Sequence, residues 1–148
     1  MLVVLFVLAA MSSLAPGRDH TELGGAIARV VLDGKPLFAG DETRIRSAAF
    51  LIAVAMRESS LKNDAVGDNG HSVCAMQIYD GPRSYLTDAD ACVRRGVEMI
   101  RESFAACRSL PIEERLALYA RGKCDSAEGR RLSRDRFALA ARIAKVQP

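Results

Sequence analysis

The stretch "AMRESSLKNDAVGDNGHSVCAMQIY", Ala55 to Tyr79, decides the fold that this sequence predicts. It begins near the end of an unbroken apolar run, Ala48 to Met56, and then passes through a polar segment that contains two glycines. A carboxylate, Glu58, lies where the apolar run gives way to the turns. This order of residues predicts a buried helix followed by a small β-hairpin.

Glu58 continues the apolar stripe of the predicted helix. Leu51, Val54, Ala55 and Glu58 follow the i, i+3, i+4, i+7 spacing that places residues on one helix face. A carboxylic acid on an apolar face is costly to ionise, so it can stay protonated near neutral pH and act as a general acid. Glu58 is therefore the candidate acid, and the alternative is a side chain that turns outward at the helix end.

The rest of the chain predicts mostly helix. Asn69-Gly70 suits the centre of a hairpin, and residues 72–79 are expected to form a strand. Two helices are expected before the hairpin, 21–32 and 41–58, the second with Asp41 as its cap. After the hairpin, the capping box Thr87 to Asp90 begins a helix with Val93, Val97, Ile100 and Phe104 on one face. Two more helices are expected at 111–119, ended by Gly122, and at 134–145, capped by Ser133.

Length and composition fit one globular domain. The 148 residues are 49% apolar and 26% charged, with 21 Lys and Arg against 18 Asp and Glu, a net charge of +3. This mild excess suits an anionic polymer, but no basic block is interleaved with aromatics, which disfavours nucleic acid. We expect a monomeric, mainly α domain with a small β-hairpin over 18–148, with its motifs within about 41–124.

Residues 1–17 are typical of an export signal. Leu2 to Ala10 form a short apolar core followed by small residues, and this run is shorter than the about 20 apolar residues that span a membrane. No Lys or Arg precedes the run, however, and Pro16 opposes cleavage directly after Ala15. The alternatives are an N-terminal anchor or a first helix packed on the core. A signal would send the protein to the periplasm or outside the cell, with no stable membrane insertion after its removal.

The four cysteines favour the same compartments. Cys74, Cys92, Cys107 and Cys124 lack the Cys-x-x-Cys spacing of zinc sites, so disulfides are expected, with no metal and no cofactor. Cys92 and Cys107 are expected on one helix, about 22 Å apart, which is too far to pair. Two full pairings remain, and shorter loops favour Cys74 with Cys92 and Cys107 with Cys124. A straight helix over 112–121 would instead carry Cys124 towards Cys92, and unpaired thiols are a further alternative.

Three segments together resemble the soluble lytic transglycosylase domain of the lysozyme-like superfamily: "RESSL" at 57–61, "GDNGHSVCAMQI" at 67–78 and "ALYARG" at 117–122. The family pattern is a helix that ends in Glu-Ser, a hairpin with a serine and a Gly-Leu-Met-Gln strand, and a later helix that ends in Tyr-Asn-Ala-Gly. The resemblance covers about residues 44–122. It implies an α+β lysozyme-like fold with the hairpin beside an active-site cleft, and peptidoglycan glycan strands as the substrate.

The resemblance also implies catalytic roles. Glu58 matches the acid/base of the family, and Ser59 matches the serine that usually follows it beside the substrate. Tyr119 matches a tyrosine whose hydroxyl reaches towards the catalytic carboxylate. The alternative for Tyr119 is a core aromatic.

Three hairpin residues match substrate-binding positions of the family. Ser72 matches the serine that contacts the acetamido group of the sugar, and Met76 and Gln77 match the strand that lines the cleft. Their alternatives are a turn-capping hydroxyl, a core filler and an edge residue, respectively. His71 beside them is expected to be an exposed or hydrogen-bonded residue without a role in the chemistry.

The chain departs from the family pattern at two places. Cys74-Ala75 replaces Gly-Leu, and Ala120-Arg121 replaces Asn-Ala, which removes an amide that could orient the substrate or the acid. Asp64 and Asp68 follow Glu58, and either could position a water for hydrolysis, although Asp68 beside Asn69-Gly70 is better explained as a turn residue.

The family's transglycosylases need no second carboxylate, because a hydroxyl of the muramic acid attacks and closes an anhydro ring. We therefore expect lytic cleavage of the MurNAc-GlcNAc β-1,4 bond. The alternatives are a hydrolytic lysozyme-type muramidase and a non-catalytic module that binds or assembles peptidoglycan.

Overall fold

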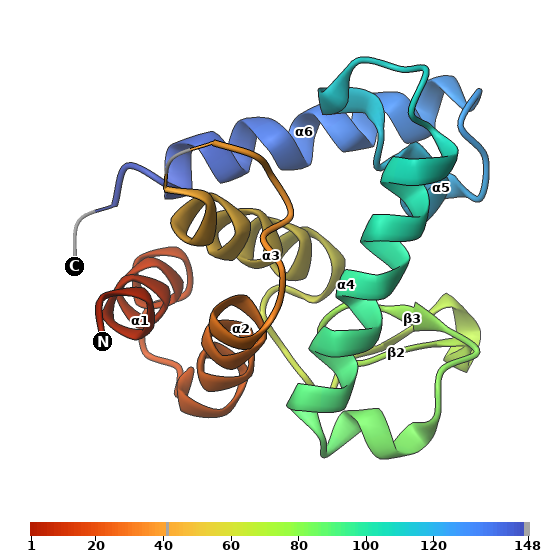
Figure 1. Ribbon diagram of the computed structural model, residues 1–148. Coiled ribbons are helices and arrows are strands. Elements are labelled where there is room, and N and C mark those ends of the chain that lie inside the picture. Colours follow the sequence, from red (N-terminus) through yellow and green to blue (C-terminus); the bar gives the residue numbers. More distant parts are fainter. Residues whose placement is uncertain (41, 147–148) are drawn as a thin grey trace.

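The computed structural model describes residues 1–40 and 42–146. Within them the chain forms six α-helices, three short 3-10 helices and one antiparallel sheet (Figure 1). The α-helices are α1 (Leu2–Leu14), α2 (Thr21–Asp33), α3 (Thr43–Ser59), α4 (Ala89–Ala106), α5 (Ala117–Arg121) and α6 (Ala127–Ile143). The strands are β1 (Val66–Gly67), β2 (Ser72–Val73) and β3 (Ile78–Tyr79), and the 3-10 helices are η1 (Asp68–Gly70), η2 (Arg83–Leu86) and η3 (Ile112–Glu114). The mainly α fold with a small β element is thus confirmed.

Helix α3 lies at the centre of the molecule. Residues 47–55 are buried on every side of the helix, as the unbroken apolar run predicts. Helix α6 packs along one side of α3, and α1 and α2 pack along another (Figure 1). Helix α4 packs on α2 and carries the sheet beside its first half. The end of α3 is therefore held between the main helical core and the sheet.

The N-terminal segment forms helix α1, which packs on α2 and α3. Its apolar side is buried at Val3, Phe6, Val7, Ala10 and Met11. This arrangement is that of a first helix packed on the core, and cleavage of the segment stays a prediction. None of the helices in residues 1–40 and 42–146 has both the length and the apolar character needed to cross a bilayer.

The hairpin turn lies where the sequence predicts it, but the strand after it is shorter. Strands β1 and β2 pair in antiparallel register around η1, which contains Asn69-Gly70. A single strand over 72–79 is wrong. The chain turns after Val73, because Cys74 and Gln77 adopt left-handed backbone conformations, with φ of 67° and 48°, and Gln77 N donates to Cys74 O at 3.0 Å. Strand β3 then pairs with β2 and completes a three-stranded sheet.

The caps of two helices differ from those predicted. Asp88, not Thr87, caps α4, because its carboxylate accepts a hydrogen bond from Ala91 N at 2.9 Å. Helix α6 begins earlier than expected, at Ala127, where the hydroxyl of Ser126 is the cap. Asp41, the expected cap of α3, lies outside the described residues.

Ser133, the expected cap of the last helix, lies inside α6. Its hydroxyl is buried, accepts from Leu116 N at 3.0 Å and donates to Glu113 O at 2.7 Å. The hydroxyl thus joins α6 to the segment before α5. Serine hydroxyls bind free backbone groups both at helix caps and in tertiary contacts. A serine that the sequence predicts as a cap therefore makes a tertiary contact here.

The expected helix over 111–119 is broken into η3 and α5. The two pieces meet near Arg115 and Leu116, and Gly122 ends α5 with φ of 73°. This break lets the chain return, so Cys124 reaches Cys107, and the second disulfide joins Cys74 to Cys92. The favoured pairing is confirmed, and all four cysteines are oxidised.

Candidate active site

Glu58 lies in the last turn of α3. The helix ends there because Ser60 and Leu61 both adopt left-handed conformations, with φ of 54° and 62°, and their N–H groups bond back to Met56 O and Ala55 O. The Glu58 side chain is 20% exposed, so it lies between the buried stripe and the surface. Its Oε1 accepts a hydrogen bond from Arg136 Nη2 at 2.9 Å.

Arg136 is a buried cation on α6 and the partner of Glu58. The residue is only 7% exposed. Its Nη1 donates to Leu132 O at 3.3 Å, and its Nε is buried with no hydrogen-bond partner among the described residues. A buried guanidinium is costly without a paired carboxylate, so Glu58 and Arg136 depend on each other.

A second ion pair lies directly beside the first one. Arg57 donates to both carboxylate oxygens of Asp135, at 2.8 and 3.2 Å, and Asp135 Oδ2 lies 3.7 Å from Arg136 Nη1. Arg57 and Glu58 are consecutive on α3, and Asp135 and Arg136 are consecutive on α6. The two pairs, which we call the double ion pair, join the end of α3 to α6.

Tyr119 projects from α5 into the same region. Its hydroxyl donates to Met76 O in the hairpin at 2.5 Å, and its own backbone N–H donates to Ser103 Oγ at 3.1 Å. Burial raises the pKa of Tyr119 well above the usual value, the negative charge of Glu58 raises this pKa further, and Arg136 lowers it. Tyr119 therefore lies within electrostatic reach of both charges, while its hydrogen bond goes to the hairpin.

The serines expected to contact substrate make hydrogen bonds within the protein. Ser72 is 1% exposed and donates to Asp68 Oδ2. Ser59 donates to Ala55 O at 2.9 Å and accepts from Lys62 N at 3.2 Å, so it supports the end of α3. The Ser59 hydroxyl thus bonds the backbone on either side of Glu58, and the Ser72 hydroxyl bonds a side chain within the hairpin.

Met76 and Gln77 have similar supporting positions. The Met76 side chain is buried against Gly96 of α4, where an added Cβ would lie 2.7 Å from the methionine side chain. Gln77 Nε2 donates to Cys74 O at 2.9 Å and to Ala65 O at 3.3 Å. Together they fix the turn that presents the Met76 carbonyl to Tyr119.

Arg121 adds an exposed positive charge at the end of α5. Its Nη2 bonds Glu128 Oε1 at 3.1 Å, and this bond is the main reason that the pKa of Arg121 is raised. The charges of Glu58 and Asp68 make smaller contributions that raise the same pKa.

The other candidates lie apart from this cluster or interact locally. Asp64 lines a different, open cavity with Arg18 and Asp19. His71 is exposed and pairs with Asp80, with Nδ1 and Oδ1 3.0 Å apart. These contacts are ordinary surface interactions.

Sequence reasoning missed Arg136, although the signal was present. Arg136, Leu139, Ala140 and Ile143 follow the same i, i+3, i+4, i+7 spacing that identified Glu58, so a cation on the buried face of α6 was readable. A buried carboxylate on one helix and a buried cation on another predict each other, because neither is stable alone.

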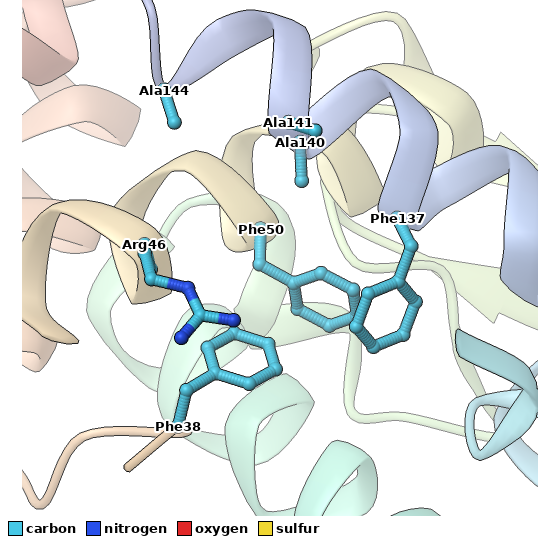
Figure 2. A pocket seen from close by; sticks show the side chains of 7 residues that line it. All are labelled: Phe38, Arg46, Phe50, Phe137, Ala140, Ala141 and Ala144. Atoms are coloured by element: carbon cyan, nitrogen blue, oxygen red, sulfur yellow. The ribbon is translucent and has the colours of Figure 1, made fainter. Parts of the chain in front are cut away.

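An aromatic cavity lies beside the first half of α3 (Figure 2). It has a volume of about 130 Å³, and Phe38, Phe50 and Phe137 form its aromatic wall. The Arg46 guanidinium lies 4.9 Å from the centroid of the Phe38 ring. The cavity contains no carboxylate or imidazole, so it offers no group for acid/base chemistry.

Over residues 1–40 and 42–146, no cluster of three or more His, Cys, Asp or Glu residues could hold a metal ion. Comparison with protein families, with curated proteins and with solved structures finds no significant match. The site is therefore interpreted from its own geometry.

Proposed function

We propose that this protein is a lytic transglycosylase that cleaves the MurNAc-GlcNAc β-1,4 bond of peptidoglycan glycan strands, with Glu58 as acid and base. Glu58 enters the reaction in its protonated form, with Oε1 still hydrogen-bonded to Arg136, and first donates its proton to the glycosidic oxygen as that bond to the muramic acid breaks. The resulting carboxylate then takes the proton from the muramic acid hydroxyl that attacks the same carbon. The products are a free GlcNAc hydroxyl and an anhydromuramic end.

The observation that supports this proposal most strongly is the convergence of three distant segments on one carboxylate. The end of α3 contributes Glu58, the hairpin contributes the Met76 carbonyl, and α5 contributes Tyr119, which lies in the field of Glu58. These are the three segments on which the resemblance rests. Their meeting in space is what a glycosidase site needs, because the acid must face a wall that can hold the sugar.

Digestion of purified peptidoglycan sacculi followed by mass analysis of the released muropeptides tests the proposal. The wild type is expected to release muropeptides with anhydromuramic ends, one water lighter than hydrolysed products. Glu58→Gln cannot exchange a proton, so release should fall by roughly 10² to 10⁴ fold while binding to sacculi persists. A variant that keeps a third of the activity would refute the role of Glu58.

A hydrolytic muramidase is the second candidate, with Asp68 as the carboxylate to test. Asp68 accepts a hydrogen bond from Ser72 in the hairpin, and a hydrolase would require a second carboxylate besides Glu58. Reducing muramic ends, or incorporation of ¹⁸O from labelled water, would select this reaction. Binding of sacculi without any release by the wild type would instead indicate a non-catalytic peptidoglycan module.

Export to the periplasm or the cell exterior is part of the same proposal. Peptidoglycan lies outside the cytoplasmic membrane, and both disulfides need an oxidising compartment. Fractionation of producing cells, with the protein detected by antibody in each fraction, tests this location.

A further inference from the structure

We infer that Arg136 is the positioning residue of Glu58, and that its guanidinium holds Oε1 so that Oε2 is the oxygen that carries the reacting proton. This inference rests on the proposed function. It assigns to Arg136 the orienting role that the resemblance implies for Tyr119.

The geometry of the pair gives Glu58 one defined orientation. Arg136 Nη2 donates to Oε1 at 2.9 Å, and the side chains of Arg136 and Glu58 are 8% and 20% exposed. The carboxylate of Glu58 is therefore the more accessible member of the pair. In the described part of the chain, the hydrogen bond to this carboxylate engages Oε1, so we assign the reacting proton to Oε2.

The guanidinium itself is fixed by α6 and by the double ion pair. Arg136 Nη1 bonds Leu132 O, one turn earlier on α6, and lies 3.7 Å from Asp135 Oδ2. Asp135 is held in turn by two hydrogen bonds from Arg57. These contacts restrain the Arg136 guanidinium, which in turn restrains the carboxylate through its bond to Oε1.

Tyr119 is already committed to another acceptor. Its hydroxyl proton goes to Met76 O at 2.5 Å, so this hydroxyl fixes the hairpin relative to α5. Arg136 is the group that bonds Glu58. Tyr119 therefore positions the hairpin, and Arg136 positions Glu58.

A fixed cation also stabilises the stage of the proposed reaction at which Glu58 is a carboxylate. After Glu58 has given its proton to the leaving oxygen, it is a carboxylate until it accepts the proton of the attacking hydroxyl. A charged hydrogen bond from Arg136 stabilises that stage and needs no rearrangement when the charge appears. No further reactant is required, because the proton lost in the first step is regained in the second.

Steady-state release of muropeptides from solubilised glycan strands by Arg136→Lys and Arg136→Gln tests this role. Arg136→Gln removes the charge, and kcat should fall by about 10 to 100 fold with KM within about twofold of wild type, because the acid is misplaced while the sugar contacts remain. Arg136→Lys keeps the charge but not the planar fork, so kcat should recover to within about tenfold of wild type.

Arg134→Gln is the matched control. It removes another arginine of α6, which pairs with Glu114 and is not part of the double ion pair. Its kcat should stay within about twofold of wild type. If Arg136→Gln does not fold, Arg136→Lys must have a lower kcat than Arg134→Gln, and equal values of kcat overturn the role of Arg136.

The results separate this inference from the proposed function. A wild type that releases no muropeptides contradicts the proposed function. An active wild type with unchanged kcat in Arg136→Lys and in folded Arg136→Gln overturns the role of Arg136 alone. A rise in KM at constant kcat also overturns it, because Arg136 would then contact substrate instead of positioning Glu58.

Discussion

Glu58 and Arg136 are each unusual for a helix face that packs on a core, and their pairing explains both. A lone carboxylate or a lone guanidinium at these positions would lose solvation without compensation. Their mutual bond at 2.9 Å makes the two residues thermodynamically coupled. Removing one partner therefore costs more than removing both, since the remaining charge has no counterpart.

A double-mutant cycle measures this coupling. Arg136→Met alone is expected to lower the free energy of unfolding by about 3 kcal/mol, because it strands the Glu58 charge. Combining it with Glu58→Gln should recover about 1 to 2 kcal/mol of that loss. Urea unfolding of the four proteins gives the values. Additivity within about 0.5 kcal/mol would show that the two side chains are independent.

Tyr119 makes the stability of the protein sensitive to alkaline pH. Its pKa is raised in the folded state, mainly by burial, whereas the unfolded chain has a tyrosine pKa near 10. Above pH of about 10 the unfolded chain loses this proton while the folded chain retains it, so stability falls as pH rises. The contribution is fully present below that pH.

Tyr119→Phe should remove this part of the pH dependence. At neutral pH the variant loses the hydrogen bond to Met76 O and is expected to be about 1 kcal/mol less stable than wild type. The difference should shrink between pH 9 and 11 in thermal unfolding curves, since Phe has no proton to lose. A constant difference across that range would contradict the assignment.

At the scale of elements, the sequence predicts where helices and turns exist better than where they end. The apolar run of α3 and Asn69-Gly70 of the hairpin are local signals, and both are confirmed. The turn at 74–77 was missed because Cys74 and Gln77 adopt positive φ without being glycine. Tertiary bonds hold them there, including the disulfide of Cys74.

The candidate site also combines a local feature that the sequence predicts with long-range contacts that it does not. Glu58 was predicted from the spacing along one helix, whereas its partner lies 78 residues away in the chain. The expected roles of Ser72 and Tyr119 came from the resemblance, and their hydrogen bonds go to Asp68 and to a backbone carbonyl. A single sequence carries no direct signal for such long-range bonds.

Helix α4 approaches the hairpin closely at Gly96, and this contact is testable. A Cβ at Gly96 would lie 2.7 Å from Met76 Cγ and Cε, so Gly96→Ala should displace the methionine. We expect a loss of about 1 to 2 kcal/mol, since overpacking exceeds the gain in helix propensity. Thermal unfolding measures it, and a weakened bond from Tyr119 to Met76 O should accompany it.

Gly25→Ala in α2 is the control for this variant. There an added Cβ would meet the end of the flexible Arg29 side chain at 3.1 Å, which can move aside. The helix propensity of alanine should then dominate and raise stability by about 0.5 to 1 kcal/mol. Equal changes in stability for Gly96→Ala and Gly25→Ala would show that the close contact between Gly96 and Met76 does not affect stability.

At the scale of the whole molecule, the two disulfides anchor both ends of α4. Cys74–Cys92 joins the hairpin turn to the first turns of α4, and Cys107–Cys124 joins the residue after α4 to the loop after α5. The first bond therefore restrains the hairpin turn beside α4, and the second restrains the chain on both sides of α5, the helix that contains Tyr119.

Titration of thiols under denaturant should find none in protein from an oxidising compartment. Replacing Cys107 and Cys124 by serine is expected to lower the free energy of unfolding by about 3 kcal/mol, given a loop with a sequence separation of 17. Chemical denaturation of the oxidised variant and wild type measures the difference. Four titratable thiols in the wild type would contradict the pairing and weaken the case for export.

The double ion pair also determines how two helices find their alignment. Arg57 and Glu58 are neighbours on α3, and they meet Asp135 and Arg136, which are neighbours on α6 in the opposite order of charge. A slip of one position would bring arginine towards arginine, or glutamate towards aspartate, so misaligned docking is repelled. Each pair joins residues that are 78 positions apart in the chain, so this pattern of charges specifies a long-range contact and not a local one. Reversing the charges on one helix should abolish the match, and reversing them on both should restore it.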